Sequence, residues 1–131
     1  MDGESAAEIF ARVTRDNRYS FDQACRTRAI SRAAELGCAE SISINFMPNA
    51  VYDPAHCLQK TLQAADRHDF PIENIIFEFI ESEDISSTAH LRAIVDEYRK
   101  RGFRTAIDDF GAGFTGVNLL IDLQPDLIKL D

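Results

Sequence analysis

The sequence lacks an excess of basic residues. Its 14 Lys and Arg are outnumbered by 22 Asp and Glu, which gives a formal net charge of −8 at pH 7. A surface that holds DNA by neutralising its phosphates needs the opposite charge, so we expect no DNA partner. An acidic chain can still bind an anionic ligand where bound cations reverse the local field.

Paired cysteines and long apolar runs are missing as well. The three cysteines Cys25, Cys38 and Cys57 form no CxxC pair, and their odd number favours a reducing compartment. We expect Cys25 and Cys57 in the core, on apolar helix faces. No apolar run approaches the roughly 18 residues of a membrane span, and no signal-peptide pattern is present. The sequence therefore predicts a cytoplasmic protein with no membrane contact in this segment.

What is present is the composition of one globular domain, with 45% hydrophobic residues among 131. Ser5 to Glu8 and Ser20 to Gln23 read as capping boxes, each opening a helix. The predicted helices cover 5–14, 20–36, 53–68, a segment from Ser86 or Ser87 to Gly102, and 117–122. The predicted strands cover 41–45, 75–80, 103–108 and 126–131. In helix 20–36 the expected buried stripe is Phe21, Cys25, Ala29, Ala33 and Leu36.

The alternation of helices and apolar strands predicts an α/β fold with a parallel sheet and right-handed crossovers. A doubly wound sheet and part of a (β/α)₈ barrel both fit this order. Polar residues decide between them, because Asn45, Glu78, Asp108 and Lys129 each lie near the carboxyl end of a different strand. Barrels collect their functional groups from successive strand ends, so we expect a TIM-like barrel.

The segment 105–116, Thr-Ala-Ile-Asp-Asp-Phe-Gly-Ala-Gly-Phe-Thr-Gly, places two adjacent carboxylates before a glycine-rich loop. Neighbouring strand residues point to opposite faces, so Asp108 and Asp109 can share a target only where the strand breaks up. Gly111, Gly113 and Gly116 permit such a break. The pair suits a divalent cation, although Asp109 could instead cap a turn.

Asn45, Glu78, Asp108 and Asp109 together offer only oxygen donors, which suit Mg²⁺ or Mn²⁺ better than zinc. Without a cation, three clustered carboxylates would raise one another's pKa. Lys129 could neutralise them structurally or position an attacking water. Oxygen-ligated metal pairs catalyse phosphoryl displacement, so the residues indicate phosphodiester hydrolysis.

Four motifs give the chain a family resemblance. They are Ser43-Ile-Asn45-Phe, Phe77-Glu78-Phe-Ile-Glu81-Ser82, Asp108-Asp-Phe-Gly111-Ala-Gly113-Phe-Thr-Gly and Ile128-Lys129-Leu-Asp131. In this order and spacing, over nearly the whole chain, they resemble the EAL domain, a family of cyclic di-GMP phosphodiesterases with a TIM-like barrel. The resemblance implies cyclic di-GMP as substrate, linear pGpG as product and two divalent cations, with Ca²⁺ expected to inhibit.

The resemblance also implies a role for each matching residue. Asn45, Glu78 and Asp108 would ligate one cation, and Asp108 with Asp109 the second. Lys129 would order the attacking water, and Asp131 would support the site. Glu81 would tether the loop that contains Gly111 and Gly113, which couples metal binding to dimerisation in this family.

The chain departs from the family pattern mildly at Ile80, Ala112, Phe114 and Gly116, none of which is a ligand position. More important, the strand with the Glu-Ala-Leu motif and the later catalytic Glu and Gln have no counterpart. We therefore expect residues 1–131 to be a partial EAL domain, about half of the barrel, with little turnover alone. Two copies could associate to close a barrel-like whole, and a regulatory sensor domain or partner is possible in the parent. The alternative is a cyclic di-GMP receptor or a protein-interaction module.

Other interpretations of single motifs are weaker. The Asp-Phe-Gly of 109–111 also occurs in protein kinases, but the remaining kinase motifs are absent. Glu81 could be an ordinary strand-end acid. His56, His68 and His90 are expected at the surface. Arg99 to Arg101 fit a helix carboxyl terminus whose dipole they complement.

Overall fold

A computed structural model describes residues 5–80, 88–111 and 116–130. Within them the sheet consists of β1 (Ile42–Asn45), β2 (Ile75–Ile80), β3 (Arg104–Phe110) and β4 (Leu127–Leu130). All three pairings are parallel, and the spatial order β1-β2-β3-β4 repeats the chain order. A doubly wound sheet reverses its order at a switch point, whereas a barrel wall does not. The predicted α/β fold with a parallel sheet is therefore confirmed, and its order is that of a barrel wall.

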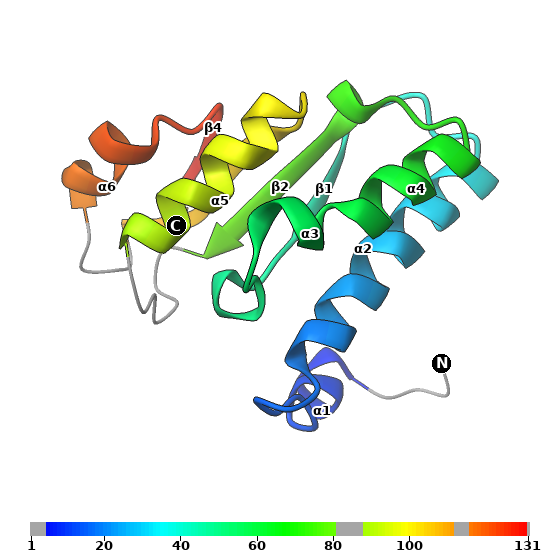
Figure 1. The fold of residues 1–131 in the computed structure, drawn as a ribbon, viewed down its shortest axis with the longest axis horizontal. Helices are drawn as coiled ribbons and strands as arrows, with labels where there is room; N and C mark the ends of the chain where they lie inside the picture. The colour runs from blue at the N-terminus through cyan, green and yellow to red at the C-terminus, as the bar shows by residue number, and fades with distance from the viewer. Residues whose placement is uncertain (1–4, 81–87, 112–115, 131) are drawn as a thin grey trace.

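The described helices cover one face of this sheet, apart from the first, which lies away from the sheet at the amino end of the second (Figure 1). They are α1 (Ala6–Phe10), α2 (Arg18–Glu35), α3 (Pro54–Cys57), α4 (Gln59–Arg67), α5 (Thr88–Lys100) and α6 (Gly116–Leu123), with short 3₁₀ turns η1 (Pro48–Ala50) and η2 (Ile72–Asn74). None of the described helices has both the length and the apolar composition needed to cross a bilayer.

The hydrophobic core lies between the helices and the sheet. Alternate strand residues such as Ile44, Phe77 and Ile107 point into it and meet buried residues of α5, including Leu91 and Tyr98. The intervening strand residues point to the other face, because side chains alternate along a strand. Of the predicted site residues, Asn45, Glu78, Asp108 and Lys129 belong to this second set, so their side chains point away from the hydrophobic core.

Several predicted boundaries are confirmed by local hydrogen bonds and backbone angles. The Ser5 side chain accepts the Glu8 amide N–H at the start of α1, and the Asp53 side chain accepts that of His56 at the start of α3. Gly37 follows α2 with φ of 67°, a conformation that glycine adopts without strain. Ser86 and Ser87, the expected caps of α5, lie outside the described residues.

The prediction for the second helix was wrong in two respects. α2 begins at Arg18, so Ser20 lies inside it and does not cap it. Its buried residues include Asp22, Gln23 and Arg26, whereas Cys25 and Leu36, expected in the core, are exposed. The reason is an ion pair between Asp22 and Arg26, which allows charged side chains to occupy the buried face. Cys57 is buried as expected.

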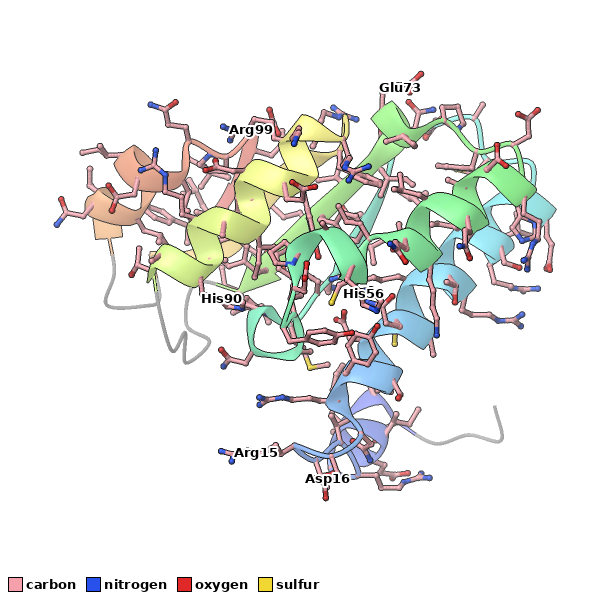
Figure 2. The ribbon with its side chains drawn as sticks, viewed as in Figure 1. Arg15, Asp16, His56, Glu73, His90 and Arg99 are labelled. Atoms are coloured by element: carbon pink, nitrogen blue, oxygen red, sulfur yellow. The ribbon has the colours of Figure 1, made fainter. Side chains whose placement is uncertain are left out.

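The helix expected over 53–68 is divided into α3 and α4. Of the three histidines, His56 is exposed, while His68 and His90 are half-buried. The His90 ring Nε2 lies 3.2 Å from the Pro48 carbonyl oxygen, so it joins α5 to η1 (Figure 2). Arg99 donates to the Leu123 carbonyl at 2.9 Å, which links α5 to the end of α6.

Candidate functional site

Two polar residues lie opposite each other on neighbouring strands, one at the end of β1 and the other two residues before the end of β2. Asn45, the last residue of β1, is in register with Glu78 of β2. Partners in a parallel pair point to the same face, so both side chains stand on the open face of the sheet. Asn45 is exposed, while the Glu78 side chain is buried at 4% exposure. The Phe46 amide N–H donates to the Glu78 carbonyl at 2.9 Å and fixes this register.

The carboxylate of Glu78 is paired with the ammonium of Lys129 from β4. Lys129 Nζ lies 2.9 Å from Glu78 Oε2 and 3.2 Å from Oε1. This hydrogen bond, with the negative charges of Glu78, Asp108 and Asp109, raises the pKa of Lys129, against a smaller opposing effect of burial. Lys129 thus contacts one of the three acids, Glu78, and its role in the site remains a prediction.

Asp108 and Asp109 lie inside β3, not after it, because the strand continues to Phe110. The break between them is a bulge. Ile107 pairs with Ile128 and Phe110 with Leu130, so two aspartates on β3 oppose the single Lys129 on β4. Asp109 has φ of 54°, and its amide N–H donates to Asp108 Oδ1 at 2.9 Å. We expected the glycines to supply this break, and instead Asp109 itself adopts the left-handed conformation.

The loop after these aspartates starts with Gly111, which has φ of 103°. The remaining predicted site residues, Gly113, Glu81 and Asp131, lie outside the described residues. Their roles remain predictions.

The donor types at these strand ends fit a hard divalent cation, because Asn45, Glu78, Asp108 and Asp109 supply only oxygen. Within residues 5–80, 88–111 and 116–130, however, no three His, Cys, Asp or Glu side chains are grouped closely enough to hold a metal ion. Both oxygens of Glu78 contact Lys129 instead. A cation at Glu78 would have to take the place of that ammonium.

Two residues that support the site were missed in the sequence. Asp22 Oδ1 accepts the Met47 amide N–H at 3.1 Å, two residues beyond Asn45. Asp22 Oδ2 also accepts from Arg26 Nε at 2.9 Å. The signal available in the sequence was an acid and a base four residues apart, which can pair on a helix. This spacing is usual for exposed ion pairs, so it did not indicate a buried one. Together these bonds fix the backbone at the end of β1 against α2.

Comparison with protein families gives a match over nearly the whole chain. The model of the EAL domain family matches residues 2–131. The antirepressor BluF of Escherichia coli K12, regulated by blue light and temperature, is 37% identical over 101 residues, which are 77% of this chain and 25% of BluF. The cyclic di-GMP phosphodiesterase PdeB of Shewanella oneidensis is 35% identical over 102 residues, 78% of this chain and 12% of PdeB. The chain thus spans a quarter or less of these two relatives.

Solved structures show the same fold. A standalone EAL protein from Vibrio cholerae O395, in its c-di-GMP-bound form, superposes with a TM-score of 0.93 at 52% identity, over 100% of this chain and 55% of that one. A manganese and cyclic di-GMP complex of Klebsiella pneumoniae BlrP1 gives 0.88 at 31% identity, over 98% of this chain and 33% of BlrP1. A calcium and cyclic di-GMP complex of BlrP1 gives 0.86. The predicted fold class, about half of a TIM-like barrel, is confirmed.

Proposed function

The chain belongs to the EAL domain family, and from this premise we propose that its parent domain hydrolyses cyclic di-GMP to linear pGpG in bacterial second-messenger signalling. The observation that carries the proposal is the contact between Lys129 and Glu78 at the carboxyl ends of their strands, beside the aspartate bulge. The similarity to proteins named cyclic di-GMP phosphodiesterases supports it.

We assign Asn45, Glu78 and Asp108 to one divalent cation, and Asp108 with Asp109 to a second, with Mg²⁺ or Mn²⁺ as the expected ions. When bound, such cations polarise the phosphodiester and stabilise charge on the attacking and leaving oxygens. Ca²⁺ has larger, more flexible coordination, and we expect it to inhibit.

In this proposal Lys129 acts as a hydrogen-bond donor to the attacking water. The ordinary pKa of a lysine lies far above neutral pH, so the side chain is an ammonium that orients the attacking water by a hydrogen bond and does not remove a proton. Release of Glu78 to a cation would also free the ammonium for this task. Asp131 and Glu81 are assigned to support Lys129 and the glycine loop.

Residues 1–131 form part of an EAL domain in this proposal, without its strand bearing the Glu-Ala-Leu motif or the second half of the barrel. The described part has β1 and β4 at the two edges of an open sheet, and open parallel edges favour association. We therefore propose a homo-oligomer in the cytoplasm, with little hydrolysis by this chain alone. The greater length of the relatives leaves room for a sensor domain in the parent.

One observation favours a second function. The relative with 37% identity is named an antirepressor, so the same scaffold could serve as a cyclic di-GMP receptor or a protein-interaction module. The discriminating result is product formation by the parent protein: binding of cyclic di-GMP without pGpG would favour the receptor.

The proposal is tested by calorimetric titration of cyclic di-GMP into the chain with Mg²⁺ or Ca²⁺, followed by product analysis under Mg²⁺. We expect cation-dependent binding that is lost in Glu78→Gln. The matched control is Glu73→Gln, an exposed acid just before the opposite end of β2 (Figure 2), which should bind as the wild type does. Binding that ignores both the cation and Glu78 would contradict the proposed site. Rapid pGpG formation by the chain alone would contradict its expected inactivity.

A further inference from the structure

A concave surface lies away from the candidate site. It is a groove of about 1290 Å³ formed by α1, α2 and α4. In Figure 1, α1 lies at the amino end of α2 and α4 along its carboxyl half. None of its lining residues belongs to the sheet or to the predicted strand-end site.

The floor of the groove is apolar. Phe10 of α1 and Phe21 of α2 meet edge to face, with ring centroids 5.5 Å apart. Phe10 remains 54% exposed despite this contact. Ile9, Ala24 and Cys25 extend the apolar surface along α1 and α2. An exposed concave apolar surface of this kind is typical of a docking site.

The rim of the groove is basic. Five of the 14 Lys and Arg line it, Arg12, Arg28, Arg32, Lys60 and Arg67, and none of its described lining residues is an Asp or Glu. Arg32 also pairs with Glu35 at 2.9 Å. In a chain of net charge −8 this is a local reversal of sign, so complementary charge can direct a partner to this groove.

We propose that the groove binds an acidic amphipathic α-helix of a partner protein. The apolar face of such a helix would cover Phe10 and Phe21, while carboxylates on its flanks would meet Arg28, Lys60 and Arg67. Helix-in-groove recognition uses this combination of an apolar stripe and charged borders, and arginine is enriched at such interfaces. A bilayer surface is less suitable because it cannot enter a concavity between three helices.

The test uses a fluorescent 18-residue synthetic peptide with Leu on one helical face and Glu on the other, measured by anisotropy with the whole chain. We expect saturable binding that weakens at least tenfold between 50 and 500 mM salt. A scrambled peptide of the same composition, which has no apolar stripe, should bind at least tenfold more weakly. Equal binding of the scrambled peptide would overturn the proposal.

Variants locate the binding. Arg28→Glu with Arg67→Glu should weaken it at least tenfold, while Arg92→Glu with Lys100→Glu, an equal charge change on α5, should not. Circular dichroism melting confirms that both variants fold. The peptide should also slow maleimide labelling of Cys25, which is exposed in the groove, without slowing that of half-buried Cys38 outside it.

Two results would identify a different occupant. Sedimentation with phosphatidylglycerol vesicles that is lost in the Arg28→Glu, Arg67→Glu variant, without peptide binding, would assign the groove to a membrane surface and overturn the proposal. Self-association lost in the same variant, without peptide binding, would assign it to a second copy of the chain and overturn it equally. None of these outcomes depends on hydrolysis or on a cation.

Discussion

Asp22 and Arg26, one turn apart on α2, form an ion pair that is almost completely buried. Arg26 Nε lies 2.9 Å from Asp22 Oδ2, and the side chains are 0% and 3% exposed, respectively. The guanidinium stands over three aromatic rings, 4.8 Å from the centroid of Phe77, 5.3 Å from that of Tyr98 and 5.7 Å from that of Phe46. The aromatic rings thus replace water around the cation, and the pair can join α2 to the sheet.

Loss of one member of this pair should destabilise the fold strongly. Arg26→Met leaves the Asp22 carboxylate buried without its counter-charge, and we expect a loss of about 3–5 kcal/mol in the free energy of unfolding. The double variant Asp22→Leu, Arg26→Met removes both charges and should be more stable than Arg26→Met alone. Urea unfolding followed by circular dichroism measures both.

The more exposed pair of Glu97, on α5, and Arg101, just beyond its end, is the matched control, with the same i, i+4 spacing, a distance of 3.1 Å and side-chain exposures of 18% and 43%. Arg101→Met should cost about 0–1 kcal/mol, since exposed ion pairs contribute little. A similar cost for Arg26→Met and Arg101→Met would show that burial of the first pair has no energetic consequence.

Ionisation of Tyr98 should lower the free energy of unfolding at alkaline pH. Burial raises its pKa above the usual value near 10, although Arg26 opposes the rise. A folded-state pKa above the unfolded one contributes stability that is complete below about pH 10 and is lost as pH rises toward the folded value. Between pH 8 and 11, the free energy of unfolding of Tyr98→Phe should therefore fall by about 1 kcal/mol less than that of the wild type. Equal losses in urea unfolding would contradict the raised pKa.

Tyr19 provides an independent check of the same effect. Burial, followed by its hydrogen bond to Tyr52, raises the pKa of Tyr19 to about 12. The chain has three tyrosines and no tryptophan, so absorbance near 295 nm follows phenol ionisation directly. Tyr19→Phe should remove a transition near pH 12, and removal of one near pH 10 instead would contradict the shift.

Lys129 should compete with a divalent cation for Glu78. Because its Nζ lies within 3.2 Å of both carboxylate oxygens, Lys129→Met should bind Mg²⁺ several-fold more tightly in calorimetry, while Glu78→Gln should lose binding. Lys100→Met, at the exposed end of α5, removes the same charge and should leave the affinity unchanged. Weaker Mg²⁺ binding in Lys129→Met would instead give Lys129 a structural role in the site.

The strands and the α5 stripe could be predicted from the sequence because both depend on local periodicity. Leu91, Ile94, Val95 and Tyr98 are buried as their spacing predicts. The contact of Lys129 with Glu78 followed from a general rule, that successive parallel strands bring their carboxyl ends to one edge.

Two features depend on tertiary contacts that periodicity does not encode. The buried face of α2 carries Asp22 and Arg26 because each neutralises the other, whereas a hydrophobicity pattern assigns each of them separately to the surface. The bulge at Asp109 arises from pairing with β4, where two residues oppose one. The sequence shows that the two aspartates are adjacent, but it does not show which backbone angle changes so that both can face one target.

A substitution at Asp109 should change stability and Mg²⁺ binding in opposite directions. The φ of Asp109, 54°, lies in the left-handed region, where a side chain costs energy that glycine avoids. Asp109→Gly should therefore raise the free energy of unfolding by about 0.5–1 kcal/mol, yet weaken Mg²⁺ binding at least tenfold by removing a proposed ligand. Asp69, just beyond α4, has the same φ of 54° and lies far from β3 in the sequence. Asp69→Gly should give the same gain in urea unfolding with unchanged Mg²⁺ affinity in calorimetry. If both variants gain stability and both keep full affinity, the strain at Asp109 is real but its carboxylate holds no cation.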